Sequence, residues 1–97
     1  MSEYKKIIQR AKEQNLDLND KYILIPYDEN SLSINGNLCF GRIFEDTNMV
    51  AVLRDVEEPY SETGFIKEPF IYRIVDKYRT YLPNSFGSYL VEFYVIE

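Results

Sequence analysis

Residues 31–55 read SLSINGNLCFGRIFEDTNMVAVLRD, and this stretch contains two turn signals between runs of β-forming residues. A two-residue type I′ turn needs positive φ at both central positions, so Asn35-Gly36 between alternating apolar flanks indicates a β-hairpin. Residues 45–48 (Glu-Asp-Thr-Asn) form a second turn signal, because such side chains bond their own backbone in loops. The stretch therefore predicts a meander of three antiparallel strands.

The two turns also predict the register of the meander and the contents of its two faces. Ile34 should lie opposite Asn37, and Phe44 opposite Met49. One face then carries apolar side chains interrupted by Arg42, namely Leu38, Phe40, Phe44, Met49, Ala51 and Leu53. The other carries Leu32, Ile34, Cys39, Gly41, Ile43, Val50 and Val52. Since both faces are apolar, both need cover, and we expect a helix or a partner to cover the second face.

The length of 97 residues predicts a single domain over residues 1–97. No apolar run approaches the ~20 residues of a membrane span, and the N-terminus lacks the apolar core of a signal peptide. Cys39 is the one cysteine and no Asn-x-Ser/Thr sequon is present, so we expect a cytoplasmic protein. The excess of Tyr and Asn over Ala is typical of an AT-rich genome, such as that of a bacterium or its phage.

Charge is distributed unevenly along the chain, which has a net charge of −5. Residues 1–12 carry +3, residues 13–62 carry −8, and residues 63–97 are neutral. The acidic middle disfavours a broad nucleic-acid-binding surface, whose affinity comes mainly from neutralised phosphates. It would instead favour a basic partner through electrostatic steering.

On either side of the meander the pattern predicts further elements. Tyr4, Ile7, Ile8 and Ala11 make one apolar stripe, which predicts a helix over residues 3–15. Residues 21–27 favour a strand that ends at Pro26 or lies at a sheet edge. Residues 88–96 are apolar on both faces, which predicts a central last strand.

Residues 56–82 are the least regular part of the pattern. Residues 56–68 predict a long contact loop with Tyr60 and Phe65 as aromatic anchors. Residues 69–82 predict a second helix, with Pro69 in its first turn and Pro83 just past its end. The abundance of Ile, Val, Tyr and Phe there leaves a long bent strand as the alternative.

The sequence offers little for catalysis. It contains no His, which removes the commonest general base and metal ligand. Cys39 fits a small buried residue better than a reactive thiolate. Acidic pairs at 17/20, 28/29, 45/46 and 57/58 fit solvated turns, although a carboxylate enzyme or metal binder is a rival interpretation. The four glycines are far apart, so no phosphate loop is present. We expect no enzyme activity, no cofactor and no metal.

Together these patterns predict an α+β domain with a mainly antiparallel sheet of four to five strands, an N-terminal helix and a second helix before the last strand. The expected function is a non-enzymatic protein-interaction module, either a homodimer or an inhibitor-like binder of another protein. Its candidate contact residues are Phe40, Phe44, Met49, Tyr60 and Phe65. The alternative is a small nucleic-acid-binding protein that stacks bases on aromatic side chains beside cations. That alternative uses Tyr72, Arg73, Lys77 and Arg79.

Overall fold

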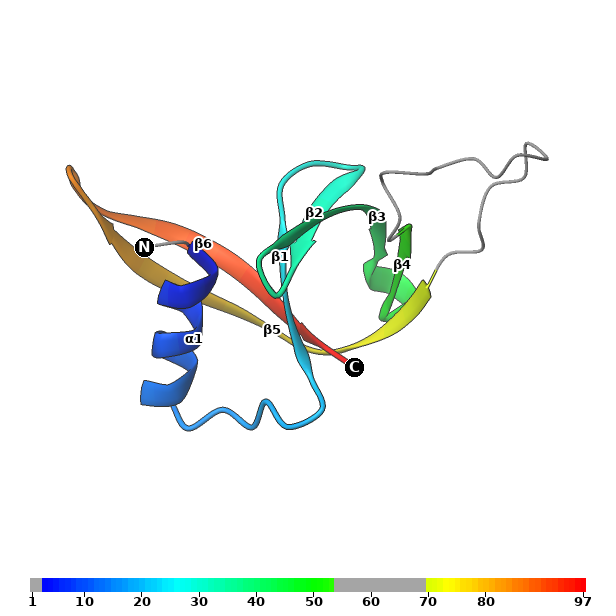
Figure 1. Cartoon of the computed structure of the whole chain (residues 1–97), viewed down its shortest axis with the longest axis horizontal. Helices are drawn as coiled ribbons and strands as arrows, with labels where there is room; N and C mark the ends of the chain where they lie inside the picture. The colour runs from blue at the N-terminus through cyan, green and yellow to red at the C-terminus, as the bar shows by residue number, and fades with distance from the viewer. Residues whose placement is uncertain (1–2, 54–69) are drawn as a thin grey trace.

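The computed structural model describes residues 3–53 and 70–97 of the chain, and within these ranges it is an α+β fold with an antiparallel sheet. A helix, α1 (Glu3–Glu13), precedes the sheet (Figure 1). The strands are β1 (Tyr22–Pro26), β2 (Ser31–Ile34), β3 (Asn37–Phe44), β4 (Met49–Leu53), β5 (Phe70–Asn84) and β6 (Gly87–Ile96). A short 3-10 helix, η1 (Glu45–Thr47), connects β3 to β4. The fold class is as predicted, but the described residues form six strands instead of four to five.

The sheet closes on itself as an up-and-down barrel. Each strand pairs antiparallel with the next one in the chain, and β6 pairs back with β1. Closure removes the unpaired edges that an open sheet would present. The predicted central position of the last strand is confirmed, because β6 pairs with both β1 and β5.

The predicted register of the meander is confirmed. Ile34 lies opposite Asn37 and Phe44 lies opposite Met49. Asn35 and Gly36 have φ angles of 51° and 86°, as a type I′ turn requires. The second turn is η1, closed by Asn48 in the left-handed region with a φ of 54°.

The barrel interior buries the second face of the meander. Apolar side chains from all six strands meet there: Leu24, Leu32, Ile34, Cys39, Val50, Val52, Tyr72, Ile74, Tyr94 and Ile96. The sequence pattern led us to expect a helix or a partner over this face. Closure of the barrel covers it instead, because the curved sheet folds the face onto itself.

A second core forms where α1 packs against β5 and the outside of β1 and β6. Beyond Ile74, β5 pairs only with β6, and before Tyr94, β6 pairs only with β5, so residues 78–93 form a two-stranded arm that leaves the barrel. Figure 1 shows the arm extending to one side with α1 next to it. Ile7 of α1 is fully buried in this core. Its other buried members are Ile23, Ile25, Leu82, Val91, Phe93 and Val95.

The prediction of a helix over residues 69–82 is wrong, and the long bent strand is the conformation found. An irregularity in the β5–β6 register between Ile74 and Asp76 leaves Val75 as an extra residue. Ile74 therefore faces the barrel interior, whereas Tyr78 and Leu82 face α1. Ile74 and Leu82 are buried, Tyr78 is partly buried, and the three are spaced four apart, which imitates the apolar stripe of a helix.

Candidate functional site

The outward-pointing side chains of β3, β4 and β5 form an apolar surface, which we call the outer face. Strand register arranges it in rows: Phe44, Met49 and Arg73 in the first, Arg42, Ala51 and Ile71 in the second, Phe40 and Leu53 in the third. Phe40 is 52 % exposed, Phe44 43 %, Met49 40 % and Ile71 55 %. Single exposed apolar residues are ordinary, but adjacent ones on rigid strands indicate an interaction surface.

The outer face is hollowed around Arg42. A depression of about 390 Å³ is lined by Asn30, Phe40, Gly41, Arg42, Ala51 and Leu53. The guanidinium carbon of Arg42 lies 5.7 Å from the centre of the Phe44 ring, within the range of a cation–π contact. Arg42 takes part in none of the ion pairs found among the described residues. The depression thus combines an apolar wall with an exposed cation.

The structure brings together three of the five residues predicted to bind protein. Phe40, Phe44 and Met49 all lie on the outer face, with Phe44 directly opposite Met49. Tyr60 and Phe65 lie outside the described residues. Sequence reasoning missed Ile71, which the predicted helix assigned to a buried side. The β-branched and aromatic run from Phe70 to Val75 was the signal for a strand, and hence for an exposed Ile71.

The residues of the nucleic-acid alternative do not share one surface. Tyr72 is buried inside the barrel, where its ring meets that of Tyr22 edge-on with centroids 5.6 Å apart. Arg73 pairs with the carboxylate of Glu97, and Arg79 Nε lies 2.8 Å from Glu92 Oε1. Base stacking needs an exposed ring beside cations, and Tyr72 does not provide one.

Lys77, the remaining residue of that alternative, belongs to a polar cluster between η1 and the arm. Its Nζ lies 3.3 Å from Glu45 Oε1 and 3.7 Å from Glu92 Oε2. The Tyr94 hydroxyl donates a hydrogen bond to the same oxygen of Glu45. This bond, followed by the contact with Lys77, lowers the pKa of Glu45. Burial is the main cause that raises the pKa of Tyr94, so the cluster holds an ionised carboxylate between a phenol and an ammonium.

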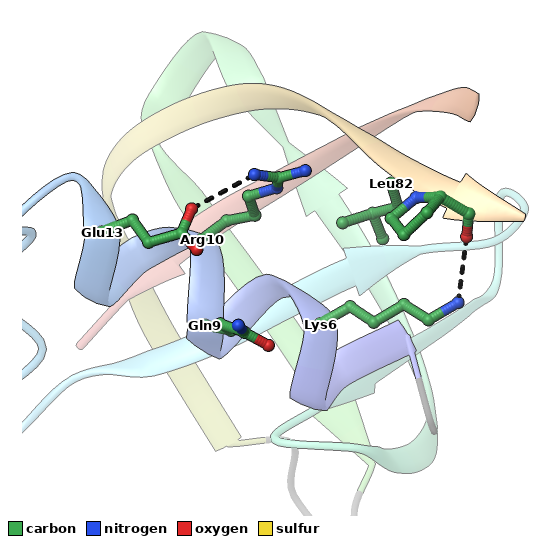
Figure 2. A pocket seen from close by; sticks show the side chains of 6 residues that line it. Lys6, Gln9, Arg10, Glu13 and Leu82 are labelled. Carbon is green, nitrogen blue, oxygen red and sulfur yellow. Dashed lines mark hydrogen bonds and ion pairs between the residues drawn. The ribbon is translucent and has the colours of Figure 1, made fainter. Parts of the chain in front are cut away.

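A groove beside α1 is another concave surface with charged side chains. Lys6, Gln9, Arg10 and Glu13 of α1 line it together with Leu82 and Pro83 of β5, around about 370 Å³ (Figure 2). Lys6 Nζ donates to the Pro83 carbonyl at 3.1 Å, and Arg10 pairs with Glu13 at 3.1 Å. Lys6 therefore attaches α1 to the arm, whereas Arg10 makes an ion pair within α1.

Residues 3–53 and 70–97 contain no group of three or more His, Cys, Asp or Glu side chains that could hold a metal ion. Cys39 is buried, with its Sγ 3.4 Å from the carbonyl oxygen of Asn37. None of the helical structure in these ranges is long and apolar enough to cross a membrane.

Comparison of the chain with protein-family models, with curated proteins and with solved structures found no match in any of the three.

Proposed function

We propose that this protein is a non-enzymatic protein-interaction module that binds its partner through the outer face of β3, β4 and β5. The observation that carries the proposal is the set of adjacent exposed apolar side chains on three paired strands, with Phe40, Phe44, Met49 and Ile71 each at least 40 % exposed. The polar clusters of the described residues pair their charges with one another, whereas the apolar side chains of the outer face stay exposed among these residues.

The energetics of the outer face fit a binding role. An aromatic side chain buries on the order of 150–250 Å² in full, and Phe40 and Phe44 are about half exposed. Covering the exposed halves of both rings would contribute roughly 4–6 kcal/mol at about 25 cal/mol per Å². Because the rings stand on paired strands of a closed barrel, little backbone ordering opposes this gain.

The test compares association of the native sequence with that of the double variant Phe40→Ala/Phe44→Ala. Tagged protein is used to capture partners from the lysate of its host, with and without nuclease, and self-association is measured by analytical ultracentrifugation. We expect the double variant to lose at least about tenfold in affinity, since two central aromatic contacts are removed. Both side chains are exposed, so its circular dichroism and melting temperature should remain near those of the native protein.

The matched control is Phe86→Ala. Phe86 lies in the turn of the arm and is 97 % exposed, so the variant removes an aromatic ring without touching the outer face. It should associate like the native protein. Association that survives Phe40→Ala/Phe44→Ala would show that the outer face is not the binding surface. Association abolished by nuclease would favour the nucleic-acid alternative.

A further inference from the structure

We infer that the partner is another protein that presents an acidic, apolar segment to the outer face, with a carboxylate on Arg42 and an apolar side chain in the adjacent depression. This inference rests on the proposed function and adds the chemistry of the partner to it. It is the opposite of what the composition favours, because a net charge of −5 would suit a basic partner.

The local charge of the outer face differs in sign from that of the whole chain. Its eight side chains include two arginines and no carboxylate. Arg73, at one corner, is already paired with Glu97. Arg42 lies in the middle row with Ala51 opposite, and none of the described ion pairs involves it. With respect to residues 3–53 and 70–97, the face therefore presents one cation outside any ion pair within an apolar surface.

The position of Arg42 suits a carboxylate. Its guanidinium lies over the Phe44 ring, and a planar guanidinium that stacks on an aromatic ring keeps its donors available around its edge. Arginine binds a carboxylate through two parallel N–H···O bonds, which are shorter and stronger than neutral hydrogen bonds. The surrounding apolar side chains would exclude water once the face is covered, which strengthens this pairing.

The depression next to Arg42 would hold the apolar side chain of the partner segment. Phe40, Ala51 and Leu53 supply most of its apolar wall, and its volume of about 390 Å³ accommodates a large apolar side chain. An Asp or Glu close in sequence to a Leu, Ile or Phe would reach both features at once. A segment of alternating acidic and apolar residues would thus complement Arg42 and the depression.

A second copy of this chain does not provide that chemistry. Two-fold packing of one outer face on another would place the Arg42 side chains of both copies in one interface, and none of the eight side chains of the face is a carboxylate that could pair with them. Like charges in an interface cost several kcal/mol, and each copy also carries a net charge of −5. The charges of the outer face therefore favour a different protein over a homodimer.

The experiment is selection of random 12-residue peptides displayed on phage against three forms of the folded protein: native, Arg42→Glu and Phe40→Ala/Phe44→Ala. We expect the native protein to enrich peptides in which Asp or Glu neighbours an aromatic or aliphatic residue. Arg42→Glu should lower the affinity of the best such peptide by about tenfold or more, and a Lys placed at the acidic position should restore binding. Arg79→Glu, which changes the net charge equally but lies on the arm, should stay within about twofold of the native affinity.

The outcomes separate this inference from the proposed function. If no enriched peptide binds Phe40→Ala/Phe44→Ala, and if Arg42→Glu weakens binding of the acidic peptides, the results support both the proposed function and the inference about the partner. Peptides without acidic residues that bind native protein and Arg42→Glu equally, but not the Phe double variant, would overturn the charge inference alone. Peptides that bind the Phe double variant as well as the native protein would overturn the outer face as the site. A native dimer that Phe40→Ala/Phe44→Ala dissociates would overturn the choice of a different protein as partner.

Discussion

Among single residues, Glu45 is exposed, yet its side chain connects η1 to both β5 and β6. It lies in η1, yet its carboxylate accepts a hydrogen bond from Tyr94 of β6 and an ion pair from Lys77 of β5. The second turn of the meander is thus attached to β5 and β6 through a side chain. Glu45 accepts from both groups more strongly when its carboxylate is ionised.

This arrangement predicts an acid-dependent contribution to stability. The hydrogen bond from Tyr94 and the Lys77 ammonium hold the pKa of Glu45 below its usual value of 4.5. The folded state therefore binds the Glu45 proton more weakly than the unfolded chain does. The resulting stabilisation is present above the unfolded pKa and is lost as the pH falls through the lower folded pKa.

We expect Glu45→Gln to be less stable than the native protein near pH 7 and to approach it as the pH falls to about 3. Urea unfolding at a series of pH values measures this difference. Glu29→Gln is the control, because Glu29 takes part in none of the ion pairs among the described residues. A difference between native and Glu45→Gln that is the same at pH 7 and pH 3 would contradict the assignment.

Asn35 illustrates what could and could not be predicted at this scale. Its place in the type I′ turn follows from local backbone preference and was predictable. Its side chain also reaches β1: Oδ1 accepts from Ile23 N at 2.9 Å, and Asn35 N donates to Ile23 O at 2.9 Å. That link joins residues twelve positions apart and depends on how β1 packs against the turn, which no local pattern specifies.

At the scale of elements, β5 is the strand whose conformation was predicted least well from the sequence. A regular strand would keep Tyr72, Ile74 and Tyr78 on one face. The extra residue at Val75 exchanges the faces, so the buried positions move from the barrel interior to the side covered by α1. Ile71 lies on the outer face because it alternates with the buried Tyr72 along the strand. The outer face was therefore predicted only in part, because the helix prediction assigned Ile71 to a buried side.

The position of β6 in the barrel predicts that deleting its last residues prevents folding. Deletion of residues 93–97 removes the pairing of β6 with β1, including Ile96 opposite Tyr22 and Tyr94 opposite Leu24. It also removes four buried side chains, Phe93, Tyr94, Val95 and Ile96, from the two cores. We expect no soluble protein from this deletion, since the barrel would open and expose both cores.

Soluble yield and gel filtration measure this effect. Glu97→Gln, which removes only the ion pair with Arg73, is the control and should remain soluble. A truncated chain that is soluble, folded and monodisperse would show that β6 is not needed to close the barrel.

At the scale of the whole molecule, the two cores share the same strands. In β1, Leu24 points into the barrel interior while Ile23 and Ile25 point toward α1. In β6, Tyr94 and Ile96 point inward while Phe93 and Val95 point outward. The sequence predicted apolar residues on both faces of the last strand, but not that two separate cores would meet there. That arrangement requires the β1–β6 pairing, which joins the first strand of the sheet to the last.

Because β1 and β6 belong to both cores, the described structure should unfold as one unit. Ile7→Ala weakens the core beneath α1, and Leu24→Ala weakens the barrel interior; both side chains are fully buried. Each variant should lose about 2–5 kcal/mol of unfolding free energy in a single transition. Urea unfolding followed by far-ultraviolet circular dichroism and by tyrosine fluorescence should give coincident curves for both. The exposed Tyr81→Ala should stay within about 0.5 kcal/mol of the native protein. Separate transitions for Ile7→Ala would instead mean that α1 can leave a barrel that stays folded, and that closure alone is sufficient to hold the outer face in place.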